Sequence, residues 1–334
     1  MTQSLTDSFN ALVLRQDENN TVSTVEQLTI ADLPEGDVLL AVEYSSINYK
    51  DSMAVTGTGK IVRTWPMVPG IDLTGTVIES QSDSYKAGDK VVLTGWSVGE
   101  KYWGGYSQIQ RVQSKWLIPL PEAIDGKTAM AIGTAGLTAM LCVLALEDAG
   151  ITPTTGPIVV TGAGGGVGSV ATAILSSLGY SVTAVSGRSS THTYLKGLGA
   201  KEIISREDMA QPSRPLEAQK WAGAVDTVGD AILARVLAET DYNGCVAACG
   251  LAGGFKLPTT VMPFILRNVR LQGVDSVMCP NERRQKAWKR LATDLPAGAL
   301  SEINRVVGLN DIKQVAEDMM AGKVQGRTVV DLNA

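Results

Sequence analysis

The stretch VVTGAGGGVGS, residues 159–169, decides the fold of this chain. It joins a strand predicted at Ile158–Thr161 to a helix predicted from about Gly166 to Leu178, and a second strand is expected at Ser181–Ser186. A strand, a glycine-rich turn and a helix in this order are typical of a parallel sheet that binds a dinucleotide, because glycine lets the backbone approach a pyrophosphate at the helix N-terminus. The strict Gly-x-Gly-x-x-Gly spacing is not met, so a merely flexible turn is the alternative interpretation. The 29 residues from Ile158 to Ser186 are the size of one strand–helix–strand unit, which favours the dinucleotide site.

Strands and helices alternate throughout the chain from Thr128 onward. A helix is predicted at Thr128–Leu146, and Gly150 and Pro153 beyond it are good stop signals. Further strands are predicted at Glu202–Ile204, Ala224–Val228, Cys245–Cys249 and Val269–Val274, and further helices at Thr193–Leu198, Asp230–Glu239 and Asn281–Leu295. This alternation predicts an α/β fold with a doubly wound parallel sheet.

Before about residue 125 the pattern consists of short apolar runs separated by turn residues, without long helices. The predicted strands are Ala11–Leu14, Val38–Ile47, Gly75–Glu79, Lys90–Leu93 and Ile109–Val112. Such a series is typical of a compact, barrel-like β domain. The tail from Asp311 to Asp331 is predicted to hold one helix and one strand.

Composition excludes several classes of function. The 334 residues include 29 basic and 34 acidic ones, and a net charge of −5 offers no electrostatic footprint for a nucleic acid or an anionic membrane. Four scattered cysteines and one histidine form no zinc-binding pattern, so we expect free thiols and no metal. The start MTQSLTDSFN lacks the features of a secretory signal, and the apolar run Ala139–Leu146 is short for a membrane span. We therefore expect a cytoplasmic protein.

The segment between Asp148 and Glu202 contains no acidic residue. An NAD site usually places a carboxylate at the end of the second strand to bind the ribose 2′-hydroxyl, but here that place carries Ser186, Gly187 and Arg188. Arg188 can bind a 2′-phosphate with two hydrogen bonds, helped by the Ser186 hydroxyl. The sequence therefore predicts NADP(H) rather than NAD(H); a solvated arginine in a turn is the alternative.

Several motifs together resemble those of the medium-chain dehydrogenases/reductases. They are Ser45–Asp51 (SSINYKD), Val68–Asp72 (VPGID), Gly133–Gly136 (GTAG), Val185–Arg188 (VSGR) and the run from Cys245 through Ser276. Within that superfamily the sequence is similar to the NADPH-dependent acryloyl-CoA reductases, a group earlier labelled quinone oxidoreductases. The resemblance implies a GroES-like catalytic domain at 1–125 and 300–334, a Rossmann NADP(H)-binding domain at 126–299, and a homodimer.

The resemblance also suggests the chemistry. In zinc-dependent relatives the first motif begins with a cysteine ligand and a Gly-His-Glu follows, whereas this chain has Asn48 and the segment ending at Asp72. Without a Lewis acid, alcohol oxidation is a poor fit, and reduction of an activated C=C bond in a small enoyl-CoA thioester fits better. An NADPH quinone or alkenal reductase and a nucleotide-binding protein without turnover are the alternatives.

The resemblance implies the following site residues. Tyr49 would contact the nicotinamide or relay a proton, with a packed aromatic as the alternative, and Asn48 would orient the substrate. Cofactor contacts are expected from the backbone of Gly164, Gly165, Gly166 and Val167 at the phosphates, from Ser186, Gly187, Arg188 and Arg206 at the 2′-phosphate, and from Leu251 and Ser276 beside the nicotinamide.

Three further features have two interpretations each. Lys50 could act in the site or pair with Asp51 in solvent. Thr134 could touch the carboxamide or only pack its helix. The run 283–290 places Arg283, Lys286 and Arg290 on one helical face, which could bind coenzyme A phosphates or simply be solvated.

Overall fold

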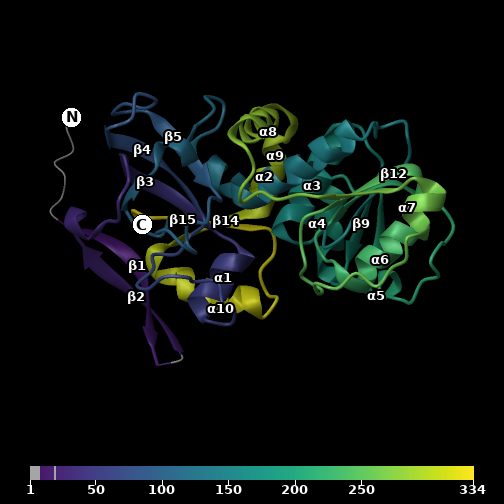
Figure 1. Ribbon diagram of the computed structural model, residues 1–334, viewed down its shortest axis with the longest axis horizontal. Coiled ribbons are helices and arrows are strands. Elements are labelled where there is room, and N and C mark those ends of the chain that lie inside the picture. Colours follow the sequence, from purple (N-terminus) through teal and green to yellow (C-terminus); the bar gives the residue numbers. More distant parts are fainter. Residues whose placement is uncertain (1–7, 19) are drawn as a thin grey trace. The chain divides into compact units, whose positions relative to one another are not determined.

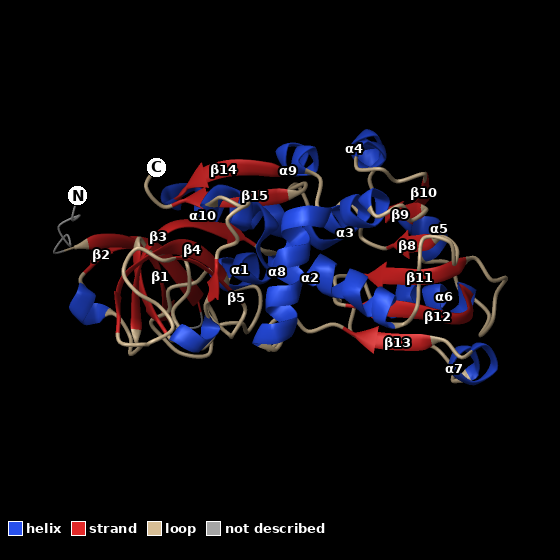
Figure 2. Ribbon diagram, turned by 90° about the horizontal axis from the view of Figure 1, so that it is seen from above, coloured by secondary structure: helices blue, strands red, loops and turns tan. Residues whose placement is uncertain are grey.

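The glycine loop lies inside a six-stranded parallel sheet with the strand order β10-β9-β8-β11-β12-β13 (Figures 1 and 2). The strands are β8 (Ile158–Val160), β9 (Val182–Ser186), β10 (Glu202–Ser205), β11 (Trp221–Asp226), β12 (Thr240–Ala248) and β13 (Arg270–Gly273). Strands β8, β9 and β11 are buried along their whole length, which explains their apolar sequences. The strand order reverses between β8 and β11, and such sheets bind ligands beyond the carboxyl ends of the strands at the reversal. The predicted doubly wound sheet is confirmed.

The computed structural model describes residues 8–18 and 20–334. The chain forms two compact units: unit 1 comprises Met1–Thr134, Val277–Gln285 and Asn304–Ala334, and unit 2 comprises Ala135–Ser276 and Lys286–Ile303. The parallel sheet belongs to unit 2. There α3 (Gly166–Ser177) packs against β8, β9 and β11, α5 (Arg206–Met209) against β9 and β10, and α6 (Asp230–Glu239) against β11 and β12. Helices α4 (His192–Gly197), α7 (Met262–Arg267) and α9 (Ala297–Ile303) also belong to unit 2.

Unit 1 contains a seven-stranded sheet with the order β14-β15-β3-β4-β5-β7, and β6 also pairs with β3. Its strands are β3 (Val38–Ile47), β4 (Asp72–Ser80), β5 (Lys90–Thr94), β6 (Ile109–Val112), β7 (Ile118–Pro119), β14 (Asn304–Gly308) and β15 (Arg327–Asp331). Strands β1 (Phe9–Asp17) and β2 (Asn20–Leu28) form a separate antiparallel hairpin. The C-terminal strand β15 pairs with β3, so residues almost 300 positions apart in the sequence become neighbours.

Two helices of unit 1 pack on each other, α1 (Tyr49–Thr56) and α10 (Ile312–Met320). The tail prediction of one helix and one strand is confirmed by α10 and β15. Helix α1 was not predicted, because its eight residues carry almost no helical apolar periodicity.

Helix α2 (Gly126–Asp148) is longer than predicted and is interrupted at Gly133, whose φ of 52° and ψ of −159° are not helical. A Cβ atom at this position would lie 2.5 Å from Arg327 Nη2 and 2.6 Å from Asp72 Oδ2. Glycine is therefore required both for the backbone conformation and for the close approach of these charged groups.

The length and hydropathy of α2 also correct one expectation. Its most apolar 18-residue window has a mean hydropathy of 2.1, so by length and composition this 23-residue helix could cross a membrane. The prediction that no apolar run reaches that length is wrong, because apolar residues continue towards the N-terminus from Ala139 to Met130. In the fold 89% of the window is buried, which is the environment of a core helix.

The cysteines behave as predicted. All four are free thiols; Cys142, Cys245 and Cys279 are buried and Cys249 is half-buried.

Candidate active site

The glycine loop packs tightly against the N-terminus of α3. Gly162 has a φ of 58°, Gly165 caps the helix, and the Gly165 N–H donates to the Gly162 carbonyl at 3.0 Å. A Cβ atom at Gly168 would lie 2.5 Å from the Gly162 oxygen. The loop therefore presents the backbone from Gly164 to Val167 at the start of a twelve-residue helix, a favourable place for an anion.

The predicted 2′-phosphate residues gather at the carboxyl ends of two neighbouring strands. Ser186 ends β9 and pairs in register with Ser205 of β10, after which Arg206 follows directly. A Cβ atom built on Gly164 would lie 3.6 Å from Arg188 Nη2, and one on Gly187 would lie 3.0 Å from Arg206 Nε. The structure thus brings both guanidinium groups against the glycine loop and the β9 turn. The Ser186 hydroxyl is 2.8 Å from the Thr191 hydroxyl.

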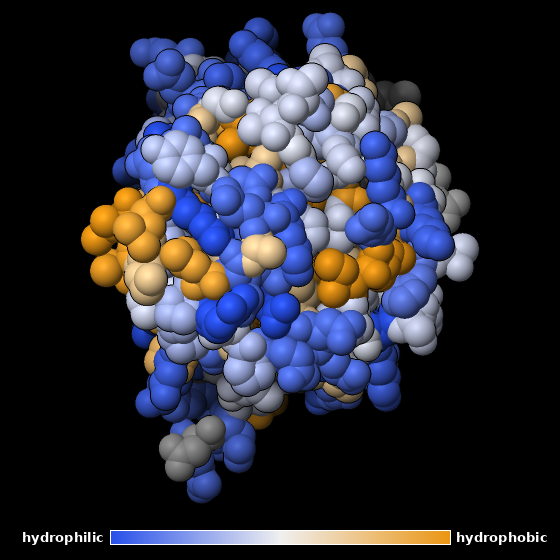
Figure 3. All heavy atoms as spheres, turned by 90° about the vertical axis from the view of Figure 1, so that its right-hand side faces the viewer, coloured by the Kyte–Doolittle hydropathy of each residue, from blue (hydrophilic) through white to orange (hydrophobic). Residues whose placement is uncertain are grey.

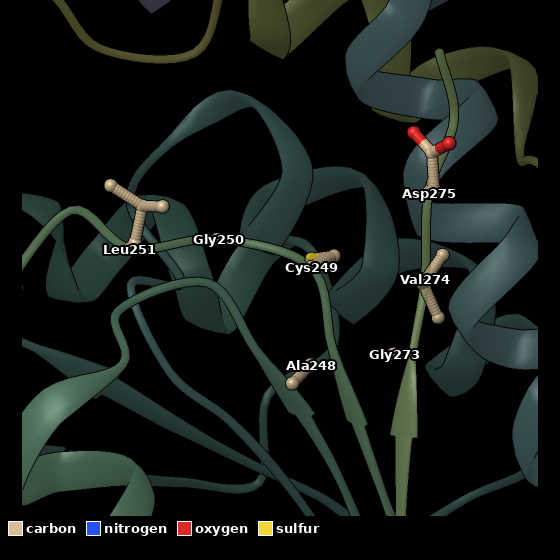
Figure 4. A pocket seen from close by; sticks show the side chains of 7 residues that line it. All are labelled: Ala248, Cys249, Gly250, Leu251, Gly273, Val274 and Asp275. Atoms are coloured by element: carbon tan, nitrogen blue, oxygen red, sulfur yellow. The ribbon is translucent and has the colours of Figure 1, made fainter. Parts of the chain in front are cut away.

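A hollow of about 490 Å³ opens at the carboxyl ends of β12 and β13 (Figure 4). It is lined by Ala248, Cys249, Gly250, Leu251, Gly273, Val274 and Asp275. Figure 4 shows the Cys249 side chain between Leu251 and Val274. The predicted Leu251 is 66% exposed on its rim, whereas Ser276 follows Asp275 and shares a 2.9 Å hydrogen bond with Thr138.

Sequence reasoning missed Asp226, which organises this edge of unit 2. Its buried carboxylate accepts hydrogen bonds from the Thr161 hydroxyl at 2.7 Å and the Gly229 N–H at 2.8 Å, and its carbonyl accepts one from the Cys249 N–H at 2.9 Å. Burial raises the pKa of this carboxyl. Asp226 therefore joins the ends of β8, β11 and β12. The sequence did carry a signal for Asp226, because it is an acidic residue at the end of an apolar strand, directly before Thr-Val-Gly.

The predicted catalytic pair lies at the start of α1 in unit 1. Asn48 is the N-cap residue and is buried, whereas Tyr49 is the first helical residue and is 53% exposed. The Asn48 Nδ2 atom donates to Asp72 Oδ2 at 2.8 Å, and its Oδ1 accepts from Arg327 Nη1 at 2.8 Å. Both ends of the Asn48 amide are therefore engaged inside the protein, while the Tyr49 side chain faces the surface of its unit.

The partners of Asn48 belong to a buried ionic cluster that the sequence analysis did not predict. Asp72 also accepts hydrogen bonds from the Ser46 hydroxyl at 2.6 Å and from the Thr134 N–H at 2.9 Å, and Arg327 Nη2 lies 3.9 Å from it. Thr134 donates its hydroxyl to the other Asp72 oxygen. We call Asn48, Asp51, Asp72, Thr134 and Arg327 the buried cluster. Thr134 thus donates twice to Asp72, a role that neither interpretation of this residue predicted.

A second carboxylate of the buried cluster belongs to Asp51, which is only 2% exposed. Its carboxylate accepts hydrogen bonds from the backbone N–H groups of Asn48 and Ile71, both at 2.9 Å. Burial, and then the nearby charge of Asp72, raise the pKa of the Asp51 carboxyl to about 7. Asp51 therefore carries a proton below about pH 7 and loses it above.

The structure gives the partners of two ambiguous basic features. Lys50 pairs with Glu100 at 2.8 Å, so the idea that it pairs with Asp51 is wrong, since Asp51 is buried. In the 283–290 run, Arg284 is fully buried and donates to the Thr94 carbonyl at 2.7 Å, while Arg290 binds Glu147 at 2.9 Å.

No group of three or more His, Cys, Asp or Glu residues suited to a metal ion occurs within residues 8–18 and 20–334.

Two family models match the chain. The alcohol dehydrogenase GroES-like domain matches residues 34–122, and the zinc-binding dehydrogenase model matches residues 166–293. Together with the two sheets, these matches place the chain in the medium-chain dehydrogenase/reductase superfamily, and the predicted fold class is confirmed.

Three relatives show to which family of this superfamily the chain belongs. The acrylyl-CoA reductase AcuI of Ruegeria pomeroyi is 56% identical over 329 residues, covering 98% of this chain and 100% of that one. The crystal structure of the yhdH oxidoreductase of Salmonella enterica in complex with NADP is 57% identical, covers 97% of this chain and 99% of that one, and has a TM-score of 0.96. Bacillus subtilis yhfP with NAD bound is 42% identical, with coverages of 97% and 99% and a TM-score of 0.95. The chain therefore belongs to the AcuI family of oxidoreductases, as predicted.

The protonated state of Asp51 makes a testable prediction about stability. In the unfolded chain this carboxyl ionises near pH 4, whereas in the fold its pKa is about 7. Between these values the folded state keeps a proton that the unfolded state has lost, so the group lowers the free energy of unfolding by roughly 1.4 kcal/mol per pH unit as the pH rises.

Urea unfolding at pH 5, 6, 7 and 8 measures this slope. Asp51→Asn should remove the contribution, so that its stability falls less between pH 5 and 7 than that of the unaltered protein. Asp17→Asn, at an exposed strand end, is the control and should leave the slope unchanged. Parallel curves for Asp51→Asn and the unaltered protein would contradict the prediction.

Proposed function

We propose that this chain reduces the C=C bond of acryloyl-CoA with NADPH, giving propanoyl-CoA. The observation that carries the proposal is the 56% identity, over 98% of the chain, to a protein named as an acrylyl-CoA reductase. An NADPH quinone or alkenal reductase is the alternative, because the same residues could serve any α,β-unsaturated carbonyl. We assign cofactor binding to unit 2, within the predicted domain 126–299, and substrate chemistry to unit 1, which holds most of the predicted domain 1–125 and 300–334.

The residues at the carboxyl edge of unit 2 suit NADP(H). The backbone from Gly164 to Val167 is a cradle at a helix N-terminus, and a Cβ atom on Gly168 would collide with the preceding backbone at Gly162 and Ala163. In our proposal this cradle holds the pyrophosphate, and Leu251 and Ser276 border the nicotinamide. When bound, NADPH supplies the hydride for the C=C bond.

Selection of the phosphorylated cofactor is assigned to Ser186, Arg188 and Arg206. A relative of the same fold holds NAD, so the fold by itself does not select the 2′-phosphate. Gly187 allows Arg206 to approach the β9 turn, where a Cβ atom would lie 3.0 Å from its Nε. Two guanidinium groups at that place favour a dianionic phosphate.

Replacing Arg188 by Ala should raise the KM for NADPH at least about tenfold more than the KM for NADH, because a hydrogen bond to a charged group is lost only with the phosphorylated cofactor. Steady-state rates with each cofactor measure this. Arg214→Ala is the matched control, since Arg214 is exposed in the same unit and pairs with Glu217. An equal rise for both cofactors would exclude Arg188 from the phosphate site.

Tyr49 is proposed as the group that serves the reacting substrate. Hydride addition at the β-carbon leaves negative charge on the thioester oxygen, and the α-carbon must then take a proton. The exposed hydroxyl of Tyr49 can relay that proton or contact the nicotinamide. Because the Asn48 amide is engaged with Asp72 and Arg327, we assign Asn48 to positioning Tyr49 rather than to touching the substrate.

Tyr49→Phe tests the proton-transfer role. Loss of a general acid should lower kcat by about 100-fold or more, whereas Tyr242→Phe, which alters an exposed tyrosine of unit 2, should have no effect. Unchanged turnover in Tyr49→Phe would remove Tyr49 from proton transfer.

The donor set of the buried cluster supports chemistry without zinc. Asn48 and Asp72 stand where the resemblance to zinc-dependent relatives places metal ligands. Here the Asn48 oxygen binds the Arg327 guanidinium, and a fixed positive charge disfavours a cation at that place.

The substrate is tested by following NADPH absorbance with acryloyl-CoA, crotonoyl-CoA, a quinone and an alkenal in parallel. The highest kcat/KM is expected for acryloyl-CoA. Preference for the quinone or the alkenal would favour the alternative, and no turnover with any of them would overturn the proposal.

We also propose a cytoplasmic homodimer. Strand β13 is an edge strand, and in the segment just before it in the chain Val261, Ile265 and Leu266 are 63%, 72% and 56% exposed. Figure 3 shows patches of apolar side chains on the side of the molecule that carries α7. An open sheet edge with apolar neighbours suits a second copy of the chain.

Replacing Ile265 by Asp should disrupt this interface, so sedimentation of the variant should show monomers. A dimer as stable as that of the unaltered protein would place the interface elsewhere. Free thiols suit the reducing cytoplasm.

A further inference from the structure

Two loops of unit 1 carry exposed aromatic and basic side chains that the chemistry proposed for Tyr49 does not use. We call Arg63, Trp65, Lys101, Tyr102 and Trp103 the aromatic-basic surface. Arg63 and Lys101 are exposed, Trp65 and Tyr102 expose 37% and 45% of their surface, and Trp103 is half-buried.

The two loops are fastened to each other. The Arg63 N–H donates to the Glu100 carbonyl at 2.8 Å, and the Thr64 hydroxyl donates to the Lys101 carbonyl at 3.1 Å. The Trp103 Nε1 atom donates to the Pro66 carbonyl at 3.0 Å. The Tyr102 ring lies 4.8 Å from the Trp116 ring, centroid to centroid. The surface is therefore a preorganised platform.

The aromatic-basic surface carries positive charge without local compensation. No acidic residue occurs between Asp51 and Asp72, and Glu100 is the only one between Asp89 and Glu122. Glu100 is already paired with Lys50. Among the described residues, no carboxylate forms an ion pair with Arg63 or Lys101.

This surface is joined to the proposed catalytic residue. The Lys50–Glu100 ion pair, with side chains only 33% and 18% exposed, ties the first turn of α1 to the loop that bears Lys101 and Tyr102. Lys50 directly follows Tyr49. A ligand reacting at Tyr49 could therefore extend over the aromatic-basic surface within one unit.

We propose that the aromatic-basic surface binds the phosphorylated adenosine end of the coenzyme A thioester. This inference rests on the proposed function and adds the place where the substrate's handle is held. Adenine stacks on exposed aromatic rings, and its phosphates bind Arg63 and Lys101. An acryloyl group is too small to supply much binding energy, so contacts with the remote nucleotide lower the KM and orient the thioester.

The basic face of α8 (Asn281–Asp294) is the other candidate for the coenzyme A phosphates. On that face Arg290 is held by Glu147 at 2.9 Å and also pairs with Asp294. Lys286 and Lys289 remain exposed there. These two lysines supply a matched control with the same loss of two charges.

The test compares acryloyl-CoA with acryloyl-pantetheine, which lacks the nucleotide. In the double variant Arg63→Ala/Lys101→Ala, the ratio of kcat/KM for acryloyl-CoA to that for acryloyl-pantetheine should fall at least about tenfold, since charged hydrogen bonds to phosphate are lost. Trp65→Leu should lower the same ratio. Lys286→Ala/Lys289→Ala should leave it unchanged. An unchanged ratio in the Arg63/Lys101 variant, or a fall only in the α8 variant, would overturn the proposal.

Binding of free coenzyme A by calorimetry gives a second measurement that needs no turnover. Weaker binding in Arg63→Ala/Lys101→Ala supports the site, and equal binding in that variant and the unaltered protein refutes it. If the unaltered protein binds coenzyme A at this surface but reduces neither thioester, the proposed reaction fails while the binding site stands.

Discussion

The hydrogen bonds to the buried carboxylate of Asp72 are the interaction on which the part of unit 1 around Asn48 and Tyr49 depends. The carboxylate has no exposed surface, and it is surrounded by donors from Ser46, Asn48 and Thr134, with Arg327 close by. A charge in such a place is tolerated only when it is paired and hydrogen-bonded, so these groups cannot be removed singly without leaving an unsatisfied partner. The donors come from the end of β3, the cap of α1, the α2 interruption and strand β15. One carboxylate therefore fixes four chain segments, and with them the position of Tyr49.

Unit 2 depends on a geometric constraint instead of a charge. Gly168 lets α3 approach Gly162 more closely than any side chain would allow, and Asp226 then ties the ends of the neighbouring strands. The result is a strand edge with backbone donors at a helix N-terminus and two guanidinium groups beside it. In the proposed function this edge holds the cofactor, while the charged and aromatic groups near Tyr49 hold the substrate. In these proposals NADPH and the coenzyme A thioester both carry phosphates. Arg188 and Arg206 bind that of the cofactor, and Arg63 and Lys101 bind those of the substrate.

Much of the architecture could be predicted because its signals are local. The buried parallel strands are apolar runs, and the glycine loop that follows β8 is a run of glycines. The acid-free segment around Arg188 is likewise visible in the sequence itself. Helix α1 was not predicted, since eight residues carry too weak a period, and α2 proved longer than its most apolar core. Pairing with Asp51 was one of two interpretations of Lys50. The observed partner, Glu100, could not be predicted because it is 50 positions away and no sequence pattern brings the two together.

The sequence by itself determined the class of fold, the glycine cradle, the arginine in place of an acid, and the absence of the usual zinc-ligand residues, because each is a matter of residue type at a short spacing. Only the tertiary structure decided what those residues do. It showed the Asn48 amide held between Asp72 and Arg327, which are 24 and 279 positions away. It also gathered Arg63, Trp65, Lys101 and Tyr102 on one surface from two separate loops. The physical reason is that the burial and the partners of a side chain depend on which chain segments lie next to each other. That arrangement is determined by pairing between strands far apart in the sequence, such as β3 and β15.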